Sequence, residues 1–184
     1  MPIFGALLDS QGRPVDNPTR LVPSAVASIL GDSGWTYSLS ATFLAWEQAT
    51  EIEGATAGTH VVDIGTLEMQ SLGPDAWRPS LSEDKLVYWE NGLAMLDLTS
   101  GESSVLDPRG DFATAAPTFT AYYRPIDPPD GGYEIVARGY EGRYEQVLAG
   151  QADAPWLSPT IAASSSRVAF IAGGVLHVFE WEAR

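Results

Sequence analysis

One feature constrains the fold of this chain more than any other: a four-residue motif that recurs about every 40 residues, a period typical of repeat architectures. Successive copies begin 42, 38 and 42 residues apart. The four copies are YSLS at Tyr37–Ser40, PSLS at Pro79–Ser82, PTFT at Pro117–Thr120 and PTIA at Pro159–Ala162. One motif alone could recur by chance, but four ordered runs that agree in four units are much harder to dismiss, so the chain is read as four repeats of one unit.

Further apolar runs follow each motif in a fixed order. The second run contains aromatic residues and ends at Trp46, Trp89, Arg124 and Ile171. The third run occupies His60–Ile64, Ala94–Leu98, Glu134–Arg138 and His177–Trp181, and a fourth ends at Leu72, Leu106 and Leu148. Tight turns containing Gly65, Gly101 and Gly142 separate the third run from the fourth, as in β-hairpins. Four short strands in about 40 residues predict an all-β propeller blade, with a β-sandwich as the alternative.

The best-formed unit, WRPSLSEDKLVYWENGLAMLDLTSGESSVL at Trp77–Leu106, resembles the TolB-type, WD-repeat-like propeller repeat. The resemblance extends from about Trp35 to Trp181, and its motifs are structural rather than catalytic. It implies a role in protein–protein interaction and an extracytoplasmic (periplasmic or secreted) location.

The repeats predict a single propeller domain over residues 1–184, with four blades. The blades are placed at about 23–73, 74–107, 108–150 and 151–184, preceded by N-terminal strands within 3–22. In this segment, Gly5–Asp9 resembles a third strand and Pro18–Leu21 a closing fourth strand. We therefore expect an N-terminal strand to complete the last blade and close the ring, since an open ring leaves unpaired sheet edges. The alternative is an arc of blades that another chain completes.

Composition excludes several classes of site. The 184 residues contain no Cys, which excludes disulfides, thiolate metal sites and cysteine nucleophiles. With 10 Lys and Arg against 24 Asp and Glu, the net charge is −14, which disfavours nucleic acid and favours cationic protein partners. The apolar runs are too short to span a membrane, so no membrane insertion is expected. The N-terminus does not have the pattern of a signal peptide.

Three tryptophans are the candidate ligand-binding residues. Trp35, Trp77 and Trp156 each lie just before a repeated motif, where they could line one face of the ring and stack on a sugar or a peptide. Packing between blades is the alternative interpretation. Three other aromatic residues at the second strand are predicted to lie in the core between blades: Trp46, Trp89 and Phe170.

The titratable candidates have structural explanations. His60 and His177 occupy the same place in two repeats, and no ligand spacing around them supports a metal site. Acidic residues also recur at the end of the third strand, at Asp9, Asp63, Asp97 and Glu180. They are predicted to accept hydrogen bonds from the following turn, the alternative being a ring of carboxylates that binds a cation. The loop Asp127–Gly132 is predicted to be a structural turn.

No catalytic signature is present. The sequence has no G-x-S-x-G motif and no glycine-rich phosphate loop before a helix, so no catalytic residue, metal or cofactor is assigned. These observations predict a non-catalytic propeller scaffold for protein–protein interaction or assembly. The alternatives are a carbohydrate-binding propeller, an arc that self-associates into a larger propeller, and a propeller hydrolase or lyase with an acidic or His–metal centre.

Overall fold

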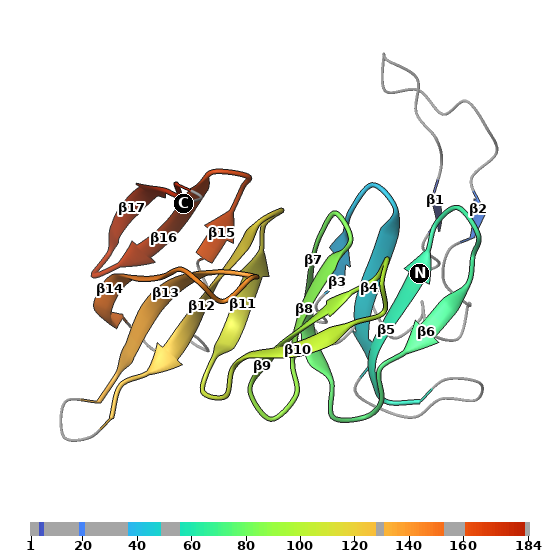
Figure 1. Ribbon diagram of the computed structural model, residues 1–184, viewed down its shortest axis with the longest axis horizontal. Coiled ribbons are helices and arrows are strands. Elements are labelled where there is room, and N and C mark those ends of the chain that lie inside the picture. The colour runs from blue at the N-terminus through green and yellow to red at the C-terminus, as the bar shows by residue number, and fades with distance from the viewer. Residues whose placement is uncertain are drawn as a thin grey trace, which may run out of the picture.

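The computed structural model describes residues 4–5, 19–20, 37–48, 56–127, 131–152 and 161–182. All regular secondary structure in these ranges is β, in 17 strands that form antiparallel sheets (Figure 1). The described part of the chain contains no helix long and apolar enough to cross a membrane.

Four sheets follow one another along the chain, and each runs up and down through consecutive strands. The first sheet contains β3 (Tyr37–Leu39), β4 (Phe43–Gln48), β5 (Gly58–Asp63) and β6 (Met69–Ser71). The second contains β7 (Trp77–Ser82), β8 (Lys85–Trp89), β9 (Leu93–Asp97) and β10 (Ser103–Asp107). The third contains β11 (Asp111–Ala115), β12 (Phe119–Pro125), β13 (Tyr133–Gly139) and β14 (Glu145–Ala152). The last contains β15 (Ile161–Ala163), β16 (Arg167–Ala172) and β17 (Val175–Glu180).

The sheets pack face to face in an arc, as propeller blades do, which confirms the predicted all-β propeller architecture. The first strand of each sheet contacts the first strand of the next, from β3 to β7, β11 and β15. Three hydrophobic clusters fill the spaces between the sheets. They are centred on Leu86 and Val61 between the first and second sheets, on Tyr122 and Val87 between the second and third, and on Phe119 and Phe170 between the third and last.

Acidic residues at the end of the third strand cap the following turn, as predicted, in two sheets. Asp63 Oδ1 accepts hydrogen bonds from the N–H groups of Gly65 and Thr66. Asp97 Oδ1 likewise accepts hydrogen bonds from the N–H groups of Thr99 and Ser100, at 2.9 Å each. In the last sheet Glu180 instead forms an ion pair with Arg167 across β16 and β17. Asp9 lies outside the described residues.

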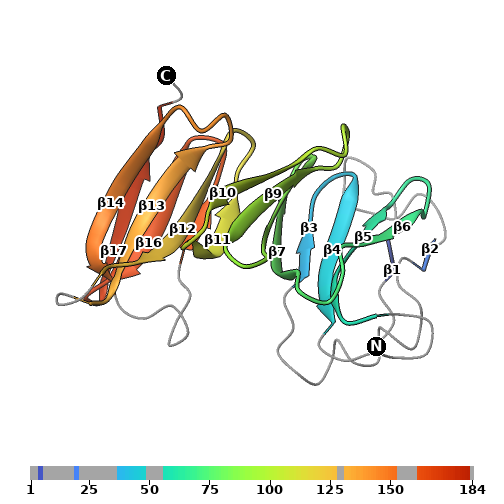
Figure 2. The same ribbon diagram turned by 60° about the horizontal axis from the view of Figure 1, so that its bottom comes forward.

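The predicted closure of the ring is wrong for the described residues. β1 (Phe4–Gly5) pairs with β2 (Thr19–Arg20), and the last sheet has three strands with no N-terminal strand beside β17. The first and last sheets lie at opposite ends of the molecule in both views (Figures 1 and 2). The physical reason is that the four sheets stand in an arc whose first and last sheets lie far apart, so that an N-terminal strand could reach β17 only if the two ends of the arc met.

Two predicted registers are also corrected. The motif PTFT is not a first strand: Pro117 and Thr118 form the turn between β11 and β12, where Ala116 donates its N–H to the carbonyl of Phe119. Trp89 is not equivalent to Trp46, because Tyr88 occupies that place in the second sheet. A shift of one residue in a strand moves a side chain to the other face of the sheet. Tyr88 is therefore buried between the sheets, whereas Trp89 is half-buried.

Candidate functional site

The structure places one of the three candidate ligand-binding tryptophans. Trp77 is the first residue of β7 and is half-buried, directly opposite Trp89 on β8. Trp35 and Trp156 lie outside the described residues. That the three rings line one face of the ring therefore stays a prediction.

The two histidines hold equivalent places in their sheets. His60 pairs with Trp46 across β4 and β5, and the two rings stack with centroids 5.3 Å apart. His177 pairs with Phe170 across β16 and β17, and these rings stack at 5.2 Å. The repeat therefore accounts for both histidines as packing residues. Within the described residues, His, Asp and Glu side chains do not gather into a group of three that could hold a metal ion.

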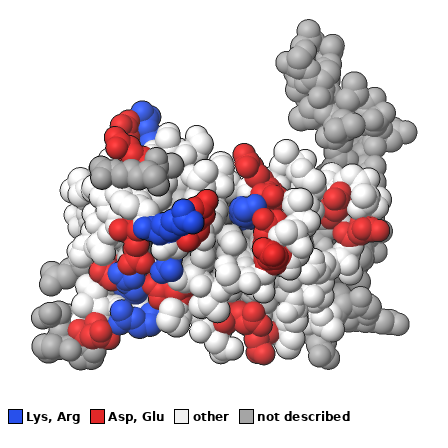
Figure 3. All heavy atoms as spheres, viewed as in Figure 1, with Lys and Arg blue, Asp and Glu red and all other residues white. Residues whose placement is uncertain are grey.

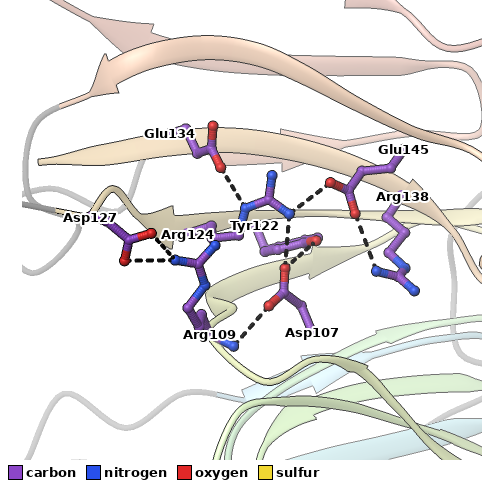
Figure 4. A network of polar contacts seen from close by, with 8 residues as sticks. All are labelled: Asp107, Arg109, Tyr122, Arg124, Asp127, Glu134, Arg138 and Glu145. Atoms are coloured by element: carbon purple, nitrogen blue, oxygen red, sulfur yellow. Dashed lines mark hydrogen bonds and ion pairs between the residues drawn. The ribbon is translucent and has the colours of Figure 1, made fainter.

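The densest group of charged side chains surrounds Arg124 on β12 (Figure 4). Its Nε donates to Glu134, and its Nη1 donates to Glu145 at 2.7 Å and to Asp107 at 3.2 Å. Glu134 and Glu145 belong to the third sheet, whereas Asp107 ends β10 of the second sheet. Arg138 donates a further hydrogen bond to Glu145. The Arg124 cluster thus joins two neighbouring sheets.

The carboxylate of Asp107 stays ionised within this cluster. Burial by itself raises its pKa, but hydrogen bonds from the backbone N–H of Arg109, the Tyr122 hydroxyl and Arg124 outweigh burial, so the pKa lies below its usual value. The same carboxylates hold the pKa of Arg124 above its usual value, against the effect of burial. The cations and carboxylates bind one another across two sheets, so the cluster holds the second sheet against the third.

Every Lys and Arg side chain from Arg78 to Arg167 forms an ion pair. The seven are Arg78, Lys85, Arg109, Arg124, Arg138, Arg143 and Arg167. On the face shown in Figure 3, the cationic side chains accordingly lie beside acidic ones instead of forming a basic field of their own. The excess of carboxylates therefore sets the sign of the surface potential.

One cross-strand pair occurs in all four sheets and shows how the last sheet differs. It is Ala45–Val61 in the first sheet, Val87–Met95 in the second, Ala121–Ala137 in the third and Ala169–Val178 in the last. In the first three sheets this pair lies in the hydrophobic cluster shared with the next sheet. In the last sheet none of the other described sheets covers this pair, and Val178 is 57% exposed.

The next pair along the same face shows the same contrast. Leu176 in β17 corresponds to Thr59, Leu93 and Ile135, which are at most 1% exposed, yet Leu176 is 66% exposed. Its cross-strand partner Ile171 is 46% exposed. We call this surface the open face; it consists of Ala162, Ala169, Ile171, Leu176 and Val178.

The opposite face of the last sheet packs against the third sheet, except at Val175 at the start of β17, which is 57% exposed. Phe170 and Phe179 stack on one another and pack with Trp181 against the third sheet. The last sheet is therefore held firmly on one side, and its open face is presented on a fixed support. Sequence reasoning identified the strands that build this face but did not single it out. The available signal was its composition, since Ile171, Leu176 and Val178 keep the apolar character of positions that are buried elsewhere.

The chain was compared with protein-family models, with curated proteins and with solved structures. No family model matches the chain, and no curated protein matches it. Among solved structures, the chain is similar to the N-terminal domain of Nup159, with 10% sequence identity and a TM-score of 0.49. The alignment covers 80% of this chain and 41% of that chain, so this chain spans less than half the length of the solved one. The propeller architecture rests on the strand pairing and the three inter-sheet clusters.

Proposed function

We propose that this protein is a non-catalytic scaffold that binds a protein partner through the open face of its last sheet. The observation that carries this proposal is the exposure of Val178, at a position where other sheets of the chain bury Val61 and Ala137 and half-bury Met95 against a neighbour. An apolar surface on a rigid support is the usual centre of a protein interface.

The polar groups of the protein support the same assignment. The Arg124 cluster and the pair of Arg78 with Asp111 both tie the second sheet to the third. Their hydrogen bonds go to one another, which suits a stiff support more than a reaction centre. Glu182 lies exposed at one end of the last sheet, and an acidic residue at a rim favours a partner with a basic residue there.

The absence of cysteine makes a direct test simple. The variant Val178→Cys carries the only thiol and can be labelled with a benzophenone photo-cross-linker, then illuminated in an extract of the cells that express the protein. The matched control is Val105→Cys on β10, which is 68% exposed and does not belong to the open face. We expect protein adducts at position 178 and none at position 105. Adducts at neither position, or equal adducts at both, would overturn the proposal.

A further inference from the structure

We infer that the partner of the open face is a second copy of this chain, whose own open face packs against it across a two-fold axis. This inference rests on the proposed function, because it names the occupant of the same surface.

The repeat itself defines what fits the open face. At the three equivalent positions of this chain, the occupant is another β-sheet with aliphatic and aromatic side chains, such as Leu86 and Tyr88 against Val61. Sheets that pack face to face lie about 10 Å apart with their strands inclined by about 30°. The occupant of the open face is therefore expected to be a sheet with an apolar face.

Two sheet faces lie at the ends of the arc and could supply such a surface: the outer face of the first sheet and the open face itself. The outer face of the first sheet carries Leu44, Trp46, His60 and Val62, and none of these is more than 3% exposed. A second copy cannot bring that face to the open face unless it first uncovers these residues, so a head-to-tail contact is disfavoured. The open face of a second copy is exposed and apolar. Pairing through it uses the same surface on both copies and stops at two.

The relief of the open face suits a two-fold contact. Ala162, Ala169 and Val178 form one row across the three strands, and Ile171 and Leu176 lie in the next row. The larger side chains are thus gathered at one side of the sheet and the two alanines at the other. After a two-fold rotation about an axis parallel to the strands, the larger side chains of each copy lie over the alanines of its partner, which is how packed sheets interdigitate.

Charge gives the proposal a distinctive signature. Arg167 and Glu180 at the edge of the open face pair with one another at 3.1 Å, so the face itself adds no unpaired charge to the contact. The rest of each copy contributes to a net charge of −14, and two such copies repel one another. Salt screens this repulsion and leaves the apolar contact intact, so dimerisation is expected to tighten as salt is raised.

The test measures the mass of the purified full chain by light scattering and sedimentation. We expect a dimer, twice 19.7 kDa, whose Kd falls when NaCl is raised from about 0.05 M to about 0.5 M. Val178→Glu is expected to raise Kd by at least about 30-fold, the size of effect seen at interface hot spots. Leu176→Ser serves as an uncharged second variant, and Val105→Glu is the matched control that leaves Kd unchanged. Near-ultraviolet circular dichroism verifies that each variant is folded.

Two outcomes overturn the inference. A monomer at all accessible concentrations in high salt excludes a second copy as the partner. A dimer that Val105→Glu weakens as much as Val178→Glu places the contact elsewhere. Photo-cross-linking at position 178 separates this failure from that of the proposed function: an adduct with a different protein, together with a monomeric purified chain, retains the scaffold and rejects only the second copy.

Discussion

The Oγ atom of Ser80 accepts a hydrogen bond from the backbone N–H of Ala115, 2.9 Å away on the first strand of the next sheet. Ser38 makes the equivalent contact one sheet earlier, accepting from the N–H of Leu81 at 2.8 Å. Each bond joins the first strands of two neighbouring sheets. The serine of the repeated motif thus has a defined structural role, which is to fix one sheet against the next.

Replacing Ser80 with alanine is expected to lower the free energy of unfolding by about 1–2 kcal/mol, because the N–H of Ala115 loses its acceptor in a partly buried place. Urea unfolding measures the change. Ser104→Ala on β10 is the matched control, since this serine is exposed, and its effect is expected to stay within about 0.5 kcal/mol. Equal losses in the two variants would contradict the role assigned to Ser80.

Replacing Arg124 with methionine is expected to destabilise the fold by about 3 kcal/mol, because Asp107, Glu134 and Glu145 would then face one another without their shared cation. Arg143→Met is the matched control: Arg143 and its partner Glu141 are 86% and 80% exposed, and such pairs contribute about 0–1 kcal/mol. Thermal and urea unfolding of both variants provide the comparison. A small effect at Arg124 would mean that the cluster does not lock the second sheet to the third.

Asp97 predicts a specific acid sensitivity. The hydrogen bond from Lys85, followed by the N–H of Ser100, lowers the pKa of Asp97 from 3.8 to about 2. Since the folded protein binds this proton more weakly than the unfolded chain does, ionised Asp97 stabilises the fold above pH 3.8, and the contribution is lost as pH falls from 3.8 to about 2.

The variant Asp97→Asn tests this sign. It is expected to have a lower Tm than the unmodified protein at neutral pH, and the difference is expected to shrink as pH falls through that window. Lys85→Met removes the largest cause of the lowered pKa and should remove most of the same pH dependence. A difference in Tm that stays constant from neutral pH to pH 2 would be inconsistent with the assignment.

Gly58 begins β5 with a φ of 108°, and a Cβ atom there would lie 1.7 Å from the carbonyl oxygen of Gly73. Gly58→Ala is therefore expected to cost about 3 kcal/mol, from backbone strain and from the forced movement of the neighbouring loop. Gly73→Ala is the matched control. Its φ is 100°, but nothing lies within 4 Å of the added atom, so only the strain of about 1–2 kcal/mol applies. Chemical denaturation distinguishes the two, and equal losses would show that the close approach of the two segments is not maintained.

Several features of the fold could be predicted from the sequence because they depend on neighbours in the chain. The alternation of apolar runs with glycine-containing turns predicted strands that pair with the next strand along. The cap of Asp97 on the turn before Gly101 was predicted from residue type alone. These interactions span only a few residues, so their cost in chain entropy is small and local sequence controls them.

The site was harder to predict, because register and neighbours decide it. Each of the first two units has a tryptophan at the end of its second apolar run, which suggested that Trp46 and Trp89 were equivalent. The strand pairing that starts from Ser82 and Lys85 instead places Tyr88 at the position of Trp46. The partners of Arg124 come from three strands of two sheets, a set that spacing in the chain does not reveal.

The repeating four-stranded unit, its turns and the apolar character of each strand thus follow from the sequence. The tertiary structure decides which of these apolar positions a neighbouring sheet covers and which, among the described residues, are exposed. The residues of the open face have the same character as their buried counterparts, and Val178 differs from Val61 only in what lies opposite. What lies opposite each position depends on the angle at which each sheet packs against the next. These angles add up along the arc, and each is set by side chains that are far apart in the chain.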